Sequence, residues 1–255
     1  MERESAAELV GLLRRATVLA AYRDGPADRK TIVDRADRSR ATVYRAEKYL
    51  SERELIEKTS DGYRITGAGE AVLEQIRGFH SGVTGALEMR SLLSHVHSSE
   101  LRENVHLLAD ATFVEDDPET PYTVEHHVRE VIDATEDRML GFTNGLGSPS
   151  LTETAYERLQ RGASLEWIFT PETLEHFRSQ YDELGERALE NENTAFYVLD
   201  EAPINLAIYD ETLIVIGFDD DRGVLSAVAI TQSPGAVAWG QRVIERYRST
   251  AERVA

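Results

Sequence analysis

Apolar positions recur at helical spacing through the first fifty residues and predict three helices joined by short turns. Leucines and alanines return every three or four positions over residues 6–22, and Ser5 is placed to cap this first helix. A turn at residues 24–26, Asp-Gly-Pro, ends it. Asp28 is the candidate cap of a second helix, and Ser39 of a third.

The pattern then changes to short strands and predicts a β-hairpin. Residues 55–59 and 63–66 read as two strands, and the Ser-Asp-Gly turn between them ends in a glycine that accepts positive φ. Three helices followed by a hairpin are the order of a winged helix-turn-helix, which we assign to residues 1–75.

A long helical stretch follows and is assigned as a linker over residues 67–100. Its apolar residues follow a heptad-like spacing, in the order Val72, Ile76, Phe79, Val83 and Ala86. This seam favours either a contact between two copies of the chain or packing on the chain's own second domain. The sequence leaves both alternatives open.

After residue 100, strand-like runs alternate with amphipathic helices. The alternation predicts a partly parallel sheet with helices against it, while short turns between the last three strands predict antiparallel pairing. The fold class is therefore α/β, with a mixed-sheet effector or sensor domain over residues 101–255. The strands are expected at 111–114, 139–143, 165–170, 195–199, 205–209, 213–218 and 225–231, and the helices at 124–134, 151–161, 173–190 and 236–253.

Composition narrows the cellular setting. The 255 residues contain no cysteine, which excludes disulfides, thiolate nucleophiles and cysteine-ligated metals. No apolar run approaches the roughly 18 residues that span a bilayer, and the charged N-terminus lacks a signal-peptide pattern. We expect a cytoplasmic protein with no membrane partner.

Charge is divided unevenly along the chain. The formal net charge is -18, and only three lysines occur, a balance that resembles proteins of extreme halophiles. Residues 1–75 hold 14 basic and 14 acidic residues, so the rest of the chain carries the whole acidic excess. An acidic protein that keeps one neutral module is predicted to turn that module toward a polyanion, namely nucleic acid.

The third helix carries the candidate DNA-contacting face. In a helix-turn-helix the second helix of the pair enters the major groove, so double-stranded DNA is the expected partner. Arginine reads guanine edges, and hydroxyl groups contact phosphates or bases. Val43, Ala46 and Leu50 are expected to face inward. The candidate contacts are Arg38, Ser39, Arg40, Thr42, Tyr44, Arg45 and Lys48, with Lys58 and Arg64 on the hairpin. The alternative is a winged helix used only for protein contact.

The stretch SRATVYRAEKYLSERELIEK, residues 39–58, resembles winged-helix transcription regulators of archaea and bacteria. It departs from their pattern at two positions. Glu47 stands where those proteins place an apolar residue, and Glu54 stands where a glycine commonly ends the helix.

Three stretches of the C-terminal half carry a second resemblance: LLADATFVEDDPETPY, GASLEWIFTPETLEHF and the run from Ile204 to Ser249. Together they resemble the C-terminal domain of archaeal regulators of the FilR type, which is related in outline to TrmB-like sensor domains and to the phospholipase-D-like fold. The resemblance implies a transcription regulator, a homodimer reading a pseudo-palindromic site. Its C-terminal domain would be non-catalytic and would sense a small-molecule effector, dimerise, or both.

Catalysis is not expected. Every lysine precedes the first histidine, His80, so the H-x-K motif of phospholipase-D-like enzymes occurs nowhere, and no GxSxG, P-loop or HExxH motif is present. The adjacent His126 and His127 would point to different sides of a helix, which indicates no metal site. We therefore expect no catalytic residue, no cofactor and no metal. The alternative function is a catalytically dead phospholipase-D-like adaptor acting through protein contacts.

Two loops that follow strands are the candidate ligand sites, because ligands of α/β sheets favour the carboxyl ends of strands. In FTNGLGSPS, glycines would let backbone N–H groups approach an anion, and Ser150 with Glu153 would form a capping box. FTPET repeats the strand-to-helix step. The alternative is that both loops are ordinary structural caps. The candidate ligand residues are Thr143, Asn144, Ser148, Thr170 and Asn205.

Overall fold

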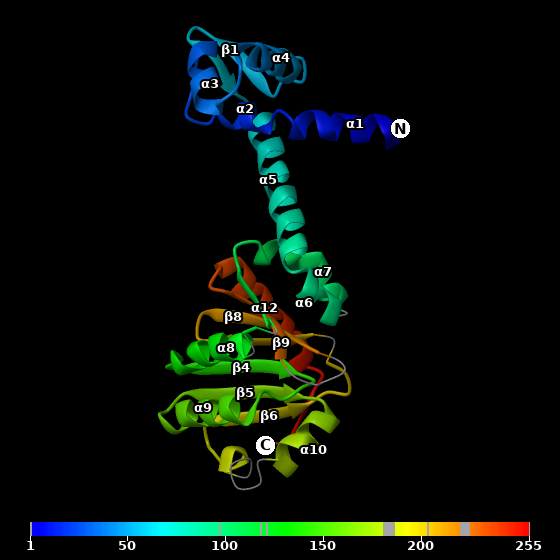
Figure 1. The fold of residues 1–255 in the computed structure, drawn as a ribbon, viewed down its shortest axis with the longest axis vertical. Coiled ribbons are helices and arrows are strands. Elements are labelled where there is room, and N and C mark those ends of the chain that lie inside the picture. The colour runs from blue at the N-terminus through cyan, green and yellow to red at the C-terminus, as the bar shows by residue number, and fades with distance from the viewer. Residues whose placement is uncertain are drawn as a thin grey trace. The chain divides into compact units, whose positions relative to one another are not determined.

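The computed structural model describes residues 2–96, 98–117, 119–120, 122–180, 187–202, 204–219 and 225–254. The chain is an α/β protein that divides into two compact units, Met1–Ser81 and Gly82–Ala255 (Figure 1). Among the helices of the described residues, none has both the length and the apolar composition that crossing a membrane requires.

The first unit is the expected winged helix-turn-helix. Its core is formed by large side chains with almost no exposure, among them Tyr22, Ile32, Val43, Leu50 and Ile56. Its elements are α1 (Glu2–Leu13), α2 (Ala16–Ala20), α3 (Arg29–Ala36), α4 (Arg40–Ser51), β1 (Ile56–Thr59) and β2 (Gly62–Ile65), and α5 (Gly67–Glu88) begins within it.

The cap predictions for α3 and α4 are confirmed. Asp28 accepts a hydrogen bond from the backbone N–H of Thr31 at 2.9 Å, and Ser39 accepts one from Thr42 at 3.2 Å. Each bond satisfies a backbone donor that the first turn of a helix leaves without an intrahelical partner. These caps fix where both helices of the helix-turn-helix begin.

The prediction of a single helix over residues 6–22 is wrong. The helix already begins at Glu2, so Ser5 lies inside it and is not its cap, and the chain breaks between α1 and α2. The regular spacing of apolar residues did not reveal that apolar residues of α1 lie in solvent while apolar residues of α2 lie in the core. Leu9 and Val10 of α1 are exposed, whereas Val18 and Leu19 of α2 are buried in the core. The break allows α2 to turn its own face inward.

Glu54 adopts the left-handed conformation that a glycine usually supplies after a helix, with φ of 55°. The backbone N–H of Leu55 donates to the carbonyl of Leu50 and that of Glu54 to Ser51, which is the Schellman arrangement at the end of α4. Glu54 thus keeps the backbone geometry that a glycine usually supplies at this position, although a residue with a Cβ atom is strained at this φ.

We expect Glu54→Gly to raise the free energy of unfolding by about 1 kcal/mol, because glycine adopts this φ without the clash that a Cβ atom introduces. Thermal denaturation of the full chain measures the effect. The matched control is Glu52→Gly, where φ is -61° and glycine is expected to destabilise. Equal destabilisation by both substitutions would contradict the account.

The second unit is built on one mixed sheet of eight strands, in the order β10-β6-β5-β4-β7-β8-β9-β3. The pairs β4–β5 and β5–β6 are parallel, and β7, β8 and β9 pair antiparallel, as the sequence predicts. The strands are β3 (Thr112–Glu115), β4 (Arg138–Thr143), β5 (Ser164–Phe169), β6 (Thr194–Val198), β7 (Asn205–Tyr209), β8 (Thr212–Phe218), β9 (Leu225–Thr231) and β10 (Glu252–Arg253).

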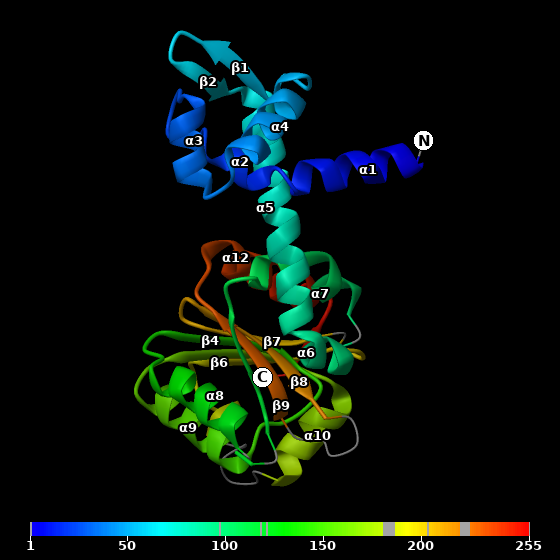
Figure 2. The ribbon, with the colours of Figure 1, turned by 45° about the horizontal axis from the view of Figure 1, so that its top comes forward.

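Helices cover both faces of this sheet (Figure 2). Because side chains alternate along a strand, β7 sends Leu206 and Ile208 to one core and Ala207 and Tyr209 to the other. The first core includes residues of α6 (Arg90–His95), α7 (Ser99–Asn104), the 3₁₀ turn η1 (Val105–Leu108) and α12 (Pro234–Arg248); the second includes residues of α8 (Thr123–Asp133), α9 (Pro149–Gln160) and α10 (Pro171–Gln180).

The last helix ends earlier than predicted. The helix predicted to reach Arg253 ends at Arg248, and the next residues form β10 against the edge of β6. That edge offers unpaired backbone groups, which a short strand satisfies better than another helical turn. Of the helix predicted over residues 173–190, α10 is described up to Gln180 and residues 187–189 are helical, while residues 181–186 lie outside the described residues.

Candidate nucleic-acid interface and ligand cavity

The outward face of α4 is basic and exposed. Val43, Ala46 and Leu50 are buried as expected, with at most 2% of each residue exposed. The residues left in solvent are Arg40, Tyr44, Arg45 and Lys48, with Arg38 just before the helix, while Thr42 is half-buried. The amphipathic pattern therefore places these five side chains outside the core of the unit.

The basic side chains of this face differ in whether they form hydrogen bonds or ion pairs within the chain. Arg45 donates to the carbonyl of Ala41 at 3.2 Å, and Lys48 lies 3.9 Å from the carboxylate of Glu52. Arg40 has no hydrogen-bond or ion-pair partner among the described residues. The guanidinium of Arg40 is thus the cation of this face that is most available to a ligand.

Other candidate contacts are already used within the unit. The hydroxyls of Ser39 and Thr42 hydrogen-bond each other at 2.9 Å as part of the cap. Arg38 donates to the carbonyl of Asp37. On the hairpin, Lys58 is exposed, whereas Arg64 donates to Glu57 across the two strands at 2.6 Å. A phosphate that binds Arg64 has to compete with this carboxylate.

Glu47 is buried inside the winged helix, with 2% of the residue exposed. It accepts hydrogen bonds from the Tyr22 hydroxyl at 3.0 Å and from Arg29 Nε at 2.6 Å. Burial, together with the Glu47 carboxylate, raises the pKa of Tyr22, so the phenol stays protonated and keeps donating. The Arg29 guanidinium also lies 4.8 Å from the ring centre of Tyr44, which connects this cluster to the exposed face.

Sequence reasoning missed this cluster. Glu47 occupies an interior position, where the resemblance to winged-helix regulators predicts an apolar residue, and it is tolerated there because two donors reach it. Its place in the inward pattern of Val43, Ala46 and Leu50 was the available signal. The partners Tyr22 and Arg29 lie 25 and 18 residues away in sequence, too far for a local pattern to indicate.

Four of the five loop residues proposed as ligand contacts have side chains that hydrogen-bond within the C-terminal unit, and Asn144 is held through its backbone N–H. Thr143 donates to the carbonyl of Gly145 at 2.7 Å, and Asn205 Oδ1 accepts from the backbone N–H of Asn144 at 2.7 Å. Thr170 accepts from the N–H of Thr173 at 3.2 Å and caps α10. These bonds fit the alternative that the loops are structural caps.

The cap of α9 is Ser148, with Pro149 at the first helical position, and not Ser150 as expected. Proline favours this position because its fixed φ suits the first turn, which moves the cap two residues earlier. Ser148 also donates to Glu125 at 2.8 Å. A Cβ atom on Gly145 would lie 2.9 Å from the ring of Phe218, so this glycine serves ring packing.

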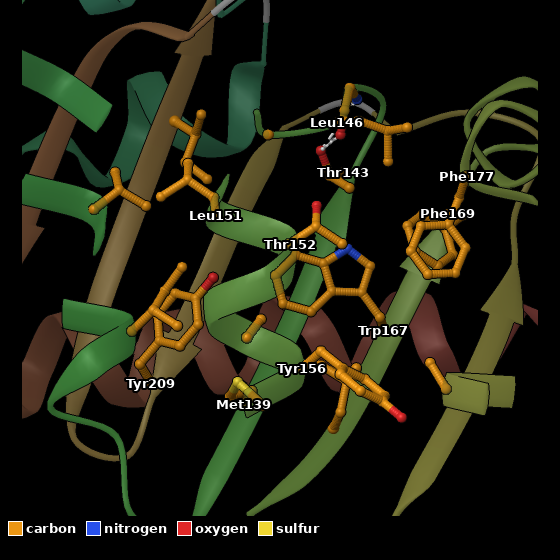
Figure 3. A pocket seen from close by; sticks show the side chains of 18 of the residues that line it. Met139, Thr143, Leu146, Leu151, Thr152, Tyr156, Trp167, Phe169, Phe177 and Tyr209 are labelled. Atoms are coloured by element: carbon orange, nitrogen blue, oxygen red, sulfur yellow. Dashed lines mark hydrogen bonds between the residues drawn. The ribbon is translucent and has the colours of Figure 1, made fainter. Parts of the chain in front are cut away.

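A cavity of about 120 Å³ lies between the sheet and helices α8, α9 and α10 (Figure 3). Of the five candidate ligand residues, only Thr143 lines it. Its walls are mostly aliphatic and aromatic, with Thr143 and Thr152 among them, and they include no charged side chain within the described part of the chain. The indole of Trp167 lies across Gly141 of the neighbouring strand, and its ring centre is 6.4 Å from that of Tyr209.

The adjacent histidines of α8 lie near one carboxylate. His126 Nε2 is 3.5 Å and His127 Nδ1 is 3.3 Å from the carboxylate oxygens of Glu130. Across the described ranges, no group of three or more histidine, aspartate or glutamate side chains is arranged to hold a metal ion.

The fold defines a winged helix-turn-helix unit joined to a mixed-sheet α/β unit, a class in which regulators are found. Residues 121–250 match the family described as the methanogenesis regulatory protein FilR1, middle domain, and residues 3–88 match the HVO_A0261 N-terminal domain. The first match covers half of the chain, and the chain therefore belongs to the FilR1 middle-domain family. The predicted FilR-type resemblance is confirmed.

Solved structures are similar to the chain at low identity. TrmBL2, an archaeal chromatin protein, is 15% identical over 95% of this chain and 94% of its own, with a TM-score of 0.46. NucT from Helicobacter pylori is 9% identical over 56% of this chain and 97% of its own, with a TM-score of 0.46. Nuc from Salmonella typhimurium, a phospholipase D family member, is 12% identical over 56% of this chain and 98% of its own, with a TM-score of 0.45. No curated protein matches the chain.

Proposed function

We propose that this protein is a DNA-binding transcription regulator that reads the major groove with α4. The observation that carries the proposal is the exposed basic face of α4, where Arg40, Tyr44, Arg45 and Lys48 lie outside the core of a winged helix. This face belongs to the neutral part of a chain whose net charge is -18. Membership of a family named for a regulatory protein supports the same function.

The proposed contacts divide by chemistry. Arg40 and Arg45 reach base edges, where a bidentate arginine selects guanine, and Lys48, Lys58 and Arg64 approach phosphates. In a cytoplasm of high salt the phosphate contribution weakens steeply through counterion release. Base contacts therefore supply most of the sequence preference of this regulator.

A homodimer is the proposed assembly. Phe79, Val83 and Leu87 follow one another at intervals of four residues on α5, so they share one side of the helix. The exposed fraction is 51% for Phe79, 44% for Val83 and 65% for Leu87. An apolar stripe left in solvent is typical of a protein interface. A dimer would read a pseudo-palindromic site whose half-sites lie about 34–36 Å apart. The C-terminal unit would then be non-catalytic and would bind a small-molecule effector.

The test of the function is DNA binding by fluorescence anisotropy, with a duplex from the region upstream of the protein's own gene, at high KCl. Arg40→Ala and Arg45→Ala are each expected to weaken specific binding at least about tenfold, the loss of one bidentate base contact. Binding to an unrelated duplex is expected to fall less.

The matched control is Arg161→Ala, which removes an exposed, ion-paired arginine from the C-terminal unit and is expected to leave DNA affinity unchanged. Circular dichroism confirms that each variant is folded. Unchanged affinity in the α4 variants would remove α4 as the reading helix. No binding by the wild-type chain at any salt concentration would favour the adaptor function instead.

A further inference from the structure

Among the described residues, Tyr209 and Trp167 bring hydrogen-bond donors without a partner to the cavity beside α9. Tyr209 is 94% buried, since 6% of the residue is exposed, and its hydroxyl points into the cavity on the side of Leu151 (Figure 3). Trp167 Nε1 also borders this space. Neither group has a hydrogen-bond partner among the described residues.

The phenol of Tyr209 is the more unusual of the two, because Trp167 is only half-buried, whereas nearly all polar groups of residues as buried as Tyr209 find a partner in the protein or in ordered water. Burial raises the pKa of Tyr209, so the phenol remains a donor across the physiological range. An oxygen acceptor placed in the cavity would satisfy the hydroxyl and recover the cost of burying it.

The other walls determine what else the ligand must be. Among the described residues, no charged side chain lines the cavity, so an anion or a cation would find no described partner for its charge there. The hydroxyl of Thr143 is already engaged with Gly145, which leaves too few free polar groups for a sugar. Aromatic rings from Tyr156, Phe169 and Phe218 supply flat apolar surface.

Size gives a third limit. At about 120 Å³ the cavity is comparable with an engineered apolar cavity of about 150 Å³ that binds benzene. One aromatic ring with a short substituent fills such a space. Leu146, Thr152 and Phe218 are half-exposed lining residues and mark where the cavity reaches the surface.

We propose that this cavity binds a small, uncharged aromatic molecule that carries one carbonyl oxygen, which accepts a hydrogen bond from Tyr209 or Trp167. This inference deepens the effector role of the proposed function and names the chemical class of the effector. Binding itself requires no DNA, so it can be tested separately from DNA recognition.

The test compares two probes of similar shape on the full chain by isothermal titration calorimetry. Acetophenone carries the carbonyl acceptor, and ethylbenzene lacks it. Wild-type protein is expected to bind both, with acetophenone the tighter. Tyr209→Phe removes one donor and is expected to weaken acetophenone about fivefold while leaving ethylbenzene unchanged, the effect of one net hydrogen bond. If the oxygen pairs with Trp167 instead, Trp167→Phe produces this selective loss.

A second variant tests the location. Ala155 lines the cavity from α9, and Ala155→Phe is expected to fill it and to abolish binding of both probes while the melting temperature is retained. The control is Tyr247→Phe, whose ring packs in the core on the opposite face of the sheet. It is expected to change neither affinity.

Three results would overturn the proposal: no binding of either probe up to its solubility limit, unchanged binding in Ala155→Phe, or equal weakening of both probes in the donor variants. If the protein does not recognise DNA, the expected results of these titrations with acetophenone and ethylbenzene do not change. The two proposals therefore fail independently.

Discussion

Glu47→Ala is expected to lower the free energy of unfolding of the winged helix by about 3 kcal/mol. The substitution leaves the fully buried hydroxyl of Tyr22 without an acceptor and removes packing volume between α2, α3 and α4. Arg29 loses its carboxylate partner as well, but its side chain is 39% exposed and stays hydrated, which limits that part of the loss.

Urea denaturation of the full chain measures this change, and two further variants identify its cause. Glu47→Gln keeps the shape and an oxygen acceptor for Tyr22, so a cost of only about 1 kcal/mol is expected. Adding Tyr22→Phe to Glu47→Ala removes the unsatisfied hydroxyl and is expected to cost less than the two single effects combined. A fully additive double variant would show that Tyr22 and Glu47 do not depend on each other.

Gly141→Ala is expected to cost the C-terminal unit about 3 kcal/mol. A Cβ atom at this position would lie 2.2 Å from the indole of Trp167, far inside contact distance. The indole would have to move away from β4, and the adjoining cavity offers the space into which it can move. The same change is therefore expected to abolish binding of acetophenone.

The measurement is urea denaturation together with near-ultraviolet circular dichroism, which reports the packing of Trp167. Gly78→Ala is the matched control, because no atom lies within 4 Å of the added methyl group and alanine favours a helix. It is expected to stabilise the chain. A Gly141→Ala variant as stable as the Gly78→Ala variant would contradict the position assigned to Trp167.

Local signals were sufficient for most of the fold. Asp28 and Ser39 cap the helices they were expected to cap, because a cap depends on residues three positions apart. The hairpin turn ends in Gly62, which has φ of 125° as a glycine turn requires. The seven strands expected in the C-terminal unit begin within one residue of their expected starts, since apolar runs and turn residues mark them directly, whereas β10 was not expected.

The sites depended on contacts between distant segments. The partners of Glu47 come from the turn after α2 and from α3, so its burial followed from tertiary packing and not from the sequence around it. The cavity arises where β4, β5 and β7 lie beside one another under α9, an arrangement that no single stretch encodes. The glycines and hydroxyls of the loops FTNGLGSPS and FTPET predicted ligand sites, yet the hydroxyls of Thr143, Ser148 and Thr170 hydrogen-bond within the chain.

The central claim is that α4 reads DNA, and genome-wide DNA occupancy of the wild-type chain and of an Arg40→Ala/Arg45→Ala variant tests it most directly. We expect the wild type to occupy discrete sites that share a pseudo-palindromic motif, and the folded variant, present at equal abundance, to lose them. Absence of discrete sites for the wild type, or the same sites retained by the variant, would contradict the account.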